Sequence, residues 1–273
     1  MRNMKQLTLP NGMDISYIDK ITALYVYNEI FEERVYLQRG LKVTDGDVIF
    51  DVGGNIGLFS KFIANHAENL KVYAFEPLFP IFEVFQENMK DEDCELHAFN
   101  VGLGMKRGRF DVIYYEKITG DSTAVPWDWD RKVDLYVENY NEAIAASMPI
   151  AKLVPKCLRK WVVERSLKRM YSGKKITCKL RTMSGIIDQY DVERIHLLKI
   201  DAENYEKQVL AALRDDHWDR IQQIAMEVHT HIPGGENLME EMIQLLESKG
   251  FTVEEGDESR ETIMGVYMLY AKR

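Results

Sequence analysis

Residues 48–60 read VIFDVGGNIGLFS, and this stretch sets the fold that we expect for the chain. Its first half is a run of β-branched and aromatic residues typical of a buried parallel strand, and its last residues have the spacing of a helix. Gly53, Gly54 and Gly57 lie between the two. Small residues and free backbone N–H groups at the carboxyl end of a strand favour a ligand that closely approaches the backbone. A tight turn that binds nothing is the alternative for this loop alone.

The spacing of the glycines excludes two familiar nucleotide-binding loops. Counted from Gly53, the dinucleotide motif G-x-G-x-x-G meets Asn55 and Leu58 where it requires glycine. The Gly-Lys-Ser/Thr of a P-loop is absent as well. Asp51 lies at the end of the strand and Asn55 lies inside the loop, so both are candidate contacts for a different ligand.

The ends of the next two strands supply further candidates. Residues 72–77 read VYAFEP, so Glu76 ends the second strand, where its carboxylate can accept hydrogen bonds from two ribose hydroxyls. An acid that stabilises the N-terminus of the following helix is the alternative. Residues 99–104, FNVGLG, place Asn100 where an adenine would lie, although aromatic and glycine residues at a strand end are equally typical of packing.

Apolar β-branched runs alternate with helical spacing from Asp47 onward, which predicts a doubly wound α/β sheet. A short polar turn separates the final two strands, so we expect them to form an antiparallel hairpin and not another crossover unit. The expected strands are Val48–Val52, Lys71–Phe75, Glu95–Val101, His196–Ile200, Ile221–Val228, Phe251–Glu255 and Ile263–Ala271. The expected helices between them are Leu58–His66, Ile81–Met89, Tyr205–Leu213 and Asn237–Lys249.

Two segments fall outside this alternation, and we expect both to cover the ligand site as lids. Residues 1–46 contain an aromatic-rich helix over Thr22–Arg39, and residues 110–189 interrupt the sheet between its third and fourth strands. The interruption begins with β-like residues Arg109–Tyr115 and includes a basic helical segment. We therefore expect a single domain over residues 1–273, with a core formed by residues 47–109 and 190–273.

Composition narrows the class of protein. The 273 residues are 46% hydrophobic and 29% charged, and no stretch is long and apolar enough to span a membrane. The three cysteines are far apart, which supports neither a disulfide framework nor a cysteine zinc site. We expect a soluble cytoplasmic protein. The net charge of −9 disfavours nucleic acid as a partner, yet residues 151–181 hold eleven Lys and Arg and one acid, a local charge of +10.

Four motifs, at the ends of four expected strands, carry a resemblance to a known family. They are DVGGNIG (51–57), FEP (75–77), LLKIDAENYEKQVL (197–210) and MEVH (226–229). In this order they resemble the FkbM-type family of S-adenosylmethionine-dependent methyltransferases, and are most similar to the O-methyltransferase domains of polyketide synthases. Gly54 stands where that family usually has alanine, and Asn204 where it usually has glycine.

The resemblance implies a seven-stranded Rossmann-like (class I) sheet with a terminal antiparallel hairpin and S-adenosylmethionine as cofactor. It also implies that the loop at residues 53–57 binds the amino-acid end of S-adenosylmethionine, the methyl donor. The residues that we expect to bind the donor are Asp51, Gly53, Asn55, Gly57, Glu76, Asn100 and Asp201. Residues 121–125, DSTAV, are a further candidate donor contact.

The acceptor side is expected at the ends of the fourth and fifth strands. Asp201 and Glu203 are two residues apart, as are Glu227 and His229, so each pair shares one face of an extended backbone. An imidazole with an unperturbed pKa of ~6.5 takes up a proton near neutrality, so His229 is the candidate general base. Glu227 would orient His229 or hold the acceptor, and Asp201 completes the catalytic set. A structural strand-end histidine is the alternative for His229.

Three further expectations concern the surroundings of this cluster. With His231, which is more typical of a solvent residue, the cluster has the residue types of a divalent metal site, but methyl transfer with a histidine base needs none, so we expect no metal. Tyr36 on the N-terminal helix and Glu203 are expected to contact the acceptor. An aromatic stripe at helical spacing is also typical of core packing.

The function expected from these residues is O-methylation of a hydroxyl or enol oxygen of a polyketide-like intermediate. The basic segment fits an acceptor tethered to an acidic acyl carrier protein, whereas the alternative is a solvated helix that neutralises an acidic body. Two other functions stay open: O-methylation of a sugar or free small natural product, and donor binding without catalysis. We expect a monomer that binds a small-molecule acceptor and neither nucleic acid nor membrane.

Overall fold

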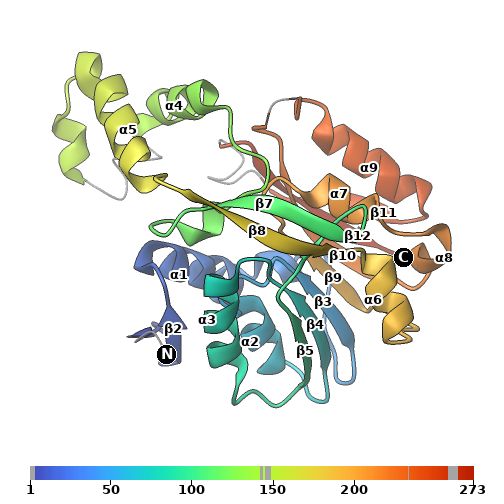
Figure 1. Cartoon of the computed structure of the whole chain (residues 1–273). Helices are drawn as coiled ribbons and strands as arrows, with labels where there is room; N and C mark the ends of the chain where they lie inside the picture. Colours follow the sequence, from blue (N-terminus) through green and yellow to red (C-terminus); the bar gives the residue numbers. More distant parts are fainter. Residues whose placement is uncertain (1–3, 142–143, 145–148, 233, 258–263) are drawn as a thin grey trace.

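A seven-stranded sheet in the order β11-β12-β10-β9-β3-β4-β5 forms the centre of the molecule (Figure 1). The computed structural model describes residues 4–141, 144, 149–232, 234–257 and 264–273. β12 is antiparallel to its neighbours β10 and β11, and the other neighbouring pairs are parallel. The strands are β3 (Val48–Val52), β4 (Lys71–Phe75), β5 (Glu95–Phe99), β9 (Leu197–Ile200), β10 (Gln223–His229), β11 (Thr252–Glu255) and β12 (Val266–Lys272).

The predicted doubly wound sheet and its antiparallel final pair are therefore confirmed. β3 and β4 have the predicted bounds, because their apolar runs are buried on both faces and end abruptly at a glycine loop and at Pro77. The other strands differ from the prediction by one or two residues at an end, and the predicted start at Ile263 lies outside the described residues.

Helices cover both faces of the sheet, and alternate residues of each strand point to opposite cores. In β3, Ile49 packs against the core under α2 and α3, whereas Phe50 and Val52 pack against the core under α6, α7 and α9. These helices are α2 (Leu58–Ala64), α3 (Phe79–Met89), α6 (Met183–Gln189), α7 (Glu206–Leu210), α8 (Asp215–Trp218) and α9 (Leu238–Ser248). α7 ends at Leu210, earlier than the predicted Leu213.

The N-terminal segment is wrongly predicted as one helix over Thr22–Arg39. A short hairpin, β1 (Lys5–Thr8) and β2 (Asp14–Tyr17), precedes α1 (Lys20–Tyr27). A π-helix (Asn28–Glu32) and a 3₁₀ turn (Val35–Leu37) then follow. Arg34 separates them, because its left-handed conformation, with φ of 52°, cannot continue a right-handed helix. The break turns Tyr36 inward, where its side chain is buried.

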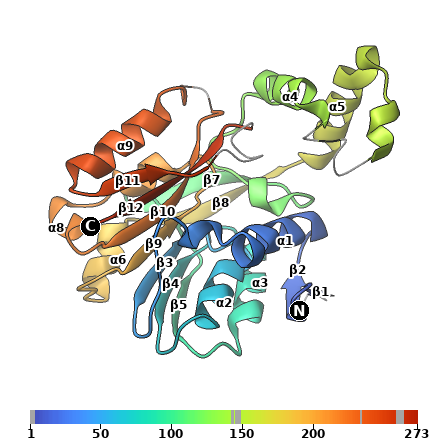
Figure 2. The same ribbon diagram turned by 180° about the vertical axis from the view of Figure 1, so that it is seen from behind.

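The inserted residues form a second sheet that carries a pair of helices away from the core (Figure 2). β6 (Gly102–Leu103) pairs with β8 (Lys174–Arg181), and β7 (Gly108–Tyr114) pairs with β8 in antiparallel register. Between β7 and β8 lie α4 (Trp129–Glu138), α5 (Lys156–Met170) and short 3₁₀ turns at Thr119–Asp121 and Pro149–Leu153. The predicted basic helix is confirmed as α5. Val163 and Leu167 of α5 are buried against α4, whereas Leu158 and Trp161 are exposed.

No helix within the described ranges is both long and apolar enough to cross a membrane.

Candidate active site

The loop after β3 keeps its shape through two left-handed glycines and close backbone contact. Gly53 and Gly57 have φ of +77° and +89°, and a Cβ atom at Gly53 would lie 1.6 Å from the backbone oxygen of Asp201. Only glycine fits there, because any side chain would collide with the end of β9. The carboxylate of Asp51 is fully buried behind this loop, where Ser60 Oγ donates to it at 2.7 Å and Lys199 Nζ lies 3.4 Å away.

Glu76 faces the same loop from the end of β4. Its carboxylate accepts hydrogen bonds from the backbone N–H groups of Leu78, at 2.8 Å, and Asn55, at 3.2 Å. Burial raises the pKa of Glu76 to about 8, although these two bonds oppose the shift. Asn100 donates to the backbone oxygens of Glu76 and Pro77, both at 3.0 Å, so its amide fixes the turn after β4.

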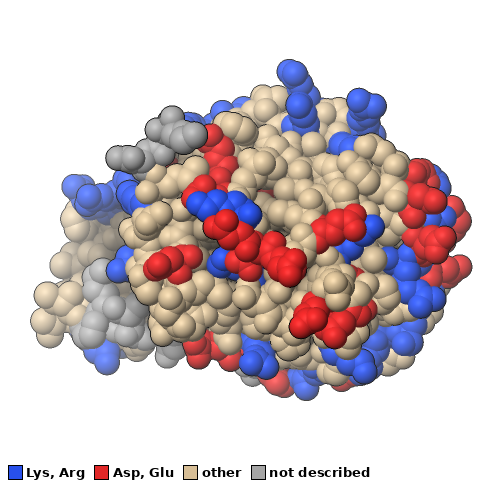
Figure 3. Space-filling view, turned by 90° about the horizontal axis from the view of Figure 1, so that it is seen from below, with Lys and Arg blue, Asp and Glu red and all other residues tan. Residues whose placement is uncertain are grey.

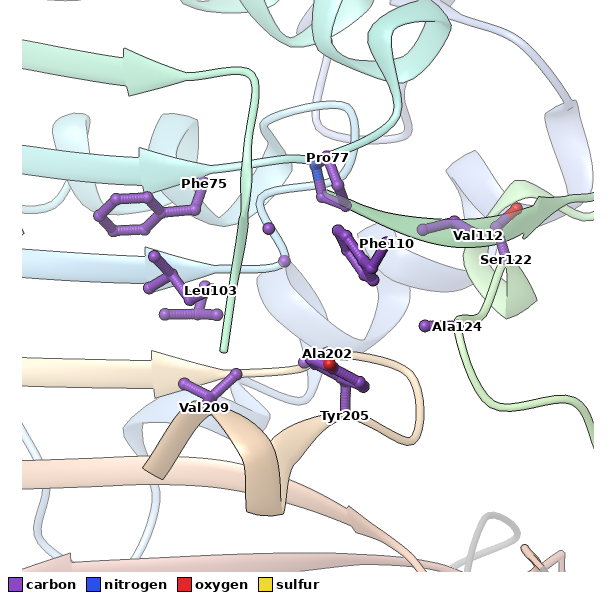
Figure 4. Close-up of a pocket in the computed structure, with 13 residues that line it drawn as sticks. Phe75, Pro77, Leu103, Phe110, Val112, Ser122, Ala124, Ala202, Tyr205 and Val209 are labelled. Atoms are coloured by element: carbon purple, nitrogen blue, oxygen red, sulfur yellow. The ribbon is translucent and has the colours of Figure 1, made fainter. Parts of the chain in front are cut away.

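Two adjoining cavities open at the carboxyl ends of β3, β4 and β9. The polar cavity contains three of the carboxylates predicted to bind ligand, those of Glu76, Asp201 and Glu203, and its lining also includes Asn55. The apolar cavity lies toward the second sheet, where Pro77, Phe110, Ala202 and Tyr205 surround the space (Figure 4). Gly53, Pro77, Ser122 and Ala202 line both cavities. Of the predicted donor residues, Asp51, Gly57 and Asn100 belong to neither lining.

The predicted acidic residues and histidine come together at the polar end of this site. We call Asp201, Glu203, Glu227 and His229 the carboxylate–histidine cluster. Tyr36 reaches it from the N-terminal segment, and its hydroxyl donates to Glu227 Oε1 at 2.5 Å and lies 3.4 Å from Asp201 Oδ2. Burial and the neighbouring Glu227 carboxylate hold the pKa of the Tyr36 phenol well above its usual value.

His229 is buried, and three carboxylates surround its ring. Nδ1 is 2.9 Å from Glu206 Oε1, and Nε2 is 3.7 Å from both Glu203 Oε2 and Glu227 Oε2. Burial alone lowers the pKa of His229, but the carboxylates of Glu206, Glu203 and Glu227 together outweigh it and hold the pKa well above 6.5. Burial raises the pKa of Glu227 to about 7 and that of Glu203 well above 4.5. The cluster therefore retains protons near neutral pH.

Two residues that position this cluster were not predicted. Glu206, and not Glu227, holds Nδ1 of His229, and its carboxylate also accepts from the backbone N–H of Asn204 at 3.1 Å. Lys199, buried in the middle of β9, donates to the backbone oxygen of Gly53 at 2.7 Å and lies 3.5 Å from Asp201 Oδ2. A lysine inside an apolar strand was the available signal for Lys199. Glu206 stands in the first turn of a helix, where acids are common for other reasons.

The same geometry leaves the metal alternative open. Asp201, Glu227 and His229 each offer a ligand atom within 4.8 Å of the others. An imidazole and carboxylates suit several divalent transition metals. A metal on Nε2 of His229 would prevent that nitrogen from accepting a proton, so the two roles exclude each other.

The insertion lies against this site through the segment after β7. Ser122 lines both cavities, and Thr123 Oγ1 donates to the backbone oxygen of Glu203 at 2.7 Å. Asn204 Nδ2 donates to Thr123 Oγ1 at 3.0 Å and to the backbone oxygen of Val125 at 3.3 Å. The predicted DSTAV segment thus contributes a wall of the site.

Comparisons with known proteins agree with this geometry. Residues 51–253 match the family model described as the methyltransferase FkbM domain. The 31-O-demethyl-FK506 methyltransferase FkbM of Streptomyces tacrolimicus is 30% identical over 253 residues, which cover 92% of this chain and 90% of that protein. Methyltransferase sdnD of Sordaria araneosa is 28% identical, over 92% of this chain and 90% of that protein.

Two further matches concern proteins of other lengths. The AMB antimetabolite synthetase AmbE of Pseudomonas aeruginosa is 30% identical over 253 residues, which cover 91% of this chain but only 11% of the synthetase. The crystal structure of methyltransferase FkbM from Methylobacillus flagellatus superposes with a TM-score of 0.51 at 14% identity, over 91% of this chain and 51% of that one. The structural match concerns the fold alone.

Proposed function

Because this chain belongs to the FkbM methyltransferase family, we propose that it is an O-methyltransferase in which His229 acts as the general base. Its sheet has the class I Rossmann-like methyltransferase architecture. One observation carries the proposal: the ring of His229, fixed by Glu206 through Nδ1, presents Nε2 to the carboxylates of Glu203 and Glu227. Glu203 also lines the polar cavity beside the donor loop.

The cofactor is S-adenosylmethionine, and the residues present fit it. The polar cavity offers the carboxylates of Glu76, Asp201 and Glu203 for the amino-acid end and the ribose, and the apolar cavity offers apolar side chains for the adenine. Glu76 would accept from the ribose, and Asp201, whose backbone packs directly against Gly53, would face the amino-acid end. When bound, the cofactor supplies an electrophilic methyl group on a positively charged sulfur.

His229 would accept the acceptor's proton at Nε2 as the acceptor oxygen forms its bond to the methyl carbon and the carbon–sulfur bond breaks. The surrounding carboxylates favour the protonated ring, so His229 must first lose a proton. The positive charge that a bound cofactor carries would favour the neutral ring of His229, because like charges disfavour each other. Glu206 keeps the ring oriented, and Tyr36 and Glu227 would position the acceptor hydroxyl.

For the acceptor we propose a polyketide-like intermediate tethered to an acyl carrier protein. The Streptomyces relative is named as the methyltransferase of 31-O-demethyl-FK506, and the match to AmbE covers a small part of a large synthetase. α5 adds exposed basic residues around Leu158 and Trp161, a surface complementary to an acidic partner. Acidic and basic side chains are interspersed on the face opposite the inserted helices (Figure 3). The proposal places a monomeric enzyme in the cytoplasm.

Labelled cofactor and an acceptor panel test this proposal. The panel contains β-hydroxy and β-keto acyl chains, each both free and carrier-tethered, together with sugars and simple alcohols. Methylation of tethered chains supports the carrier proposal, and methylation of sugars or free alcohols alone supports the small-molecule alternative. Cofactor binding without turnover of any acceptor would instead favour a non-catalytic binding module.

Replacement of the proposed base tests the role of His229. We expect His229→Ala to lower kcat by about 10²–10⁴-fold, with cofactor affinity unchanged by calorimetry. His97→Ala is the matched control, because His97 lies on β5 and pairs with Glu95 at 2.9 Å, away from the cavities. A His229→Ala enzyme with near-normal kcat would refute the assignment.

Chelation tests the metal alternative on the wild-type enzyme. A histidine base predicts an unchanged rate after dialysis against EDTA. Activity that disappears with the chelator and returns with magnesium or another divalent ion would instead place a metal on Asp201, Glu227 and His229.

A further inference from the structure

We propose that Trp127 and Asn204 form an acceptor subsite beside His229 that binds a second oxygen of the acceptor, close to the one that is methylated. This inference rests on the proposed O-methyltransferase function and deepens it by naming a feature of the substrate. It starts from two polar side-chain atoms that are buried without hydrogen-bond partners where the insertion meets the ends of β9 and β10.

The first atom is the indole Nε1 of Trp127. The Trp127 ring stacks on His231 with 3.2 Å between ring centroids, and His231 in turn lies edge-on to His229 at 5.4 Å. Nε1 is buried and donates to no atom of the described residues. An indole N–H can only donate, so its natural partner is an oxygen or another acceptor atom.

The position of the Trp127 ring is well defined by Lys132 of α4. Lys132 is 1% exposed, and its Nζ lies 3.3 Å from the centre of the Trp127 ring and 3.8 Å from that of Tyr171. Asp121 Oδ2, 3.2 Å from Nζ, balances the charge, although burial still lowers the pKa of Lys132 to about 8. A cation over the ring face draws electron density from the indole and makes its N–H a stronger donor.

The second atom is the amide oxygen of Asn204. The residue is 2% exposed and has φ of 75°, a left-handed conformation that asparagine tolerates better than most residues. Its Nδ2 binds Thr123 and the backbone oxygen of Val125, two residues before Trp127. Oδ1 is buried, and the described part of the chain gives it no donor. Each unpaired buried group costs about 1–3 kcal/mol, which a ligand can recover.

The pair selects a class of acceptor. A hydroxyl can accept from Trp127 and donate to Asn204, whereas a carbonyl can only accept, from Trp127. Both a vicinal diol and a β-hydroxy carbonyl compound carry the required second oxygen. A simple alcohol has none, so it would leave both protein atoms unpaired once its own hydroxyl is placed at His229.

Indole N–H resonances in NMR spectra test the subsite directly. The chain has four tryptophans, and Trp127→Phe assigns the Trp127 signal. With S-adenosylhomocysteine bound, we would titrate the whole protein with β-hydroxybutyryl-N-acetylcysteamine, cyclohexanediol and cyclohexanol. We expect the Trp127 N–H proton to move downfield with one or both dioxygenated probes and not with cyclohexanol. An unmoved signal with both dioxygenated probes up to their solubility limits, or an equal shift with cyclohexanol, would overturn the proposal.

Kinetics then separate this inference from the proposed function. For methylated acceptors we expect Trp127→Phe to raise KM about tenfold when a second oxygen is present and to leave KM unchanged when it is absent. Asn204→Gly keeps the left-handed backbone and should raise KM for diols more than for hydroxy carbonyl compounds. Turnover with equal effects on both acceptor classes refutes the subsite alone. A Trp127 shift without turnover of any acceptor refutes the methyltransferase proposal and leaves the subsite standing.

Discussion

The donor loop, residues 53–57, and the carboxylate–histidine cluster meet at the polar cavity, which Gly53 and Asn55 line from the loop and Asp201 and Glu203 line from the cluster, but they are built in different ways. The loop is held through its backbone: two left-handed glycines, N–H groups that donate to Phe75 and Glu76, and contact with the end of β9. The cluster works through coupled charges on side chains that come from distant parts of the chain. A change in the loop should therefore act through shape, and a change in the cluster through proton affinity.

The largest expected effect concerns shape. Gly53→Ala introduces a Cβ atom 1.6 Å from the backbone oxygen of Asp201, so the loop or the end of β9 must move. We expect loss of measurable S-adenosylhomocysteine binding by calorimetry and about 3 kcal/mol or more of destabilisation in denaturant titrations. Gly12→Ala is the control, because Gly12 has a similar φ of +84° with nothing within 4 Å of the added atom. It should cost about 1 kcal/mol. Equal effects of the two substitutions would show that backbone strain, not the contact with Asp201, limits the loop.

The next effect concerns proton affinity. Glu206→Gln removes the carboxylate that most raises the pKa of His229, so the ring should lose its proton at lower pH. The base acts in its neutral form, so wild-type activity should rise with pH through the pKa of His229. In the variant that rise should move toward acid, together with a lower plateau. Rate profiles of kcat against pH measure this, with Glu206→Asp as the charge-conserving control. If kcat rises at the same pH in Glu206→Gln as in the wild type, the titrating group is not His229.

A smaller effect is expected at Glu76, whose side chain faces the donor loop from the end of β4. Burial favours the neutral acid of Glu76, whose pKa is about 8. The ribose hydroxyls of the cofactor, however, bind best to its ionised carboxylate. Cofactor affinity should therefore strengthen as pH rises toward and beyond 8. Glu76→Gln should weaken binding about tenfold at high pH and remove this pH dependence. Calorimetric titration at several pH values tests both statements, and an equally steep dependence in the variant would contradict them.

The smallest effect belongs to the surface of the insertion. Lys156→Glu with Lys168→Glu reverses two exposed charges on α5, and should raise KM for a carrier-tethered acceptor about threefold to tenfold at low salt. The KM for the same acceptor in free form should not change. Lys42→Glu, an exposed reversal just before β3, is the control and should affect neither acceptor. If both acceptors respond equally to the α5 variant, charge on α5 does not recruit a carrier.

The donor loop and the carboxylate–histidine cluster also differ in how far the sequence predicts them. β3, its glycine loop and Glu76 follow from local spacing, because a buried strand and a tight turn each impose a short-range pattern. Asp201, Glu203, Glu227 and His229 were predicted to share one edge, because parallel strands end together. The residues that position these four side chains were not predicted. Glu206 binds His229 only because α7 packs beside β10, and no spacing rule relates residues 206 and 229.

The N-terminal segment shows the same limit. Aromatic residues at helical spacing predict a continuous helix over Thr22–Arg39, but tertiary contacts override this local preference. Tyr36 gains buried hydrogen-bond partners at Glu227 and Asp201 when the helix breaks at Arg34. Apolar residues in the basic segment likewise predict α5, but do not indicate which of them face outward.

The contacts of residues 35–39 with β10 and β12 have a consequence during protein synthesis. Tyr270 Oη donates to the backbone oxygen of Val35 at 2.6 Å, and Lys272 Nζ donates to that of Arg39 at 2.8 Å, while Tyr36 binds Glu227. Glu227 follows Tyr36 by 191 residues and Tyr270 follows Val35 by 235 residues, so these partners leave the ribosome much later. In the nascent chain the backbone oxygens of Val35 and Arg39 and the hydroxyl of Tyr36 lack these partners until β10 and β12 emerge, so this part of the fold can be completed only after β12 has left the ribosome.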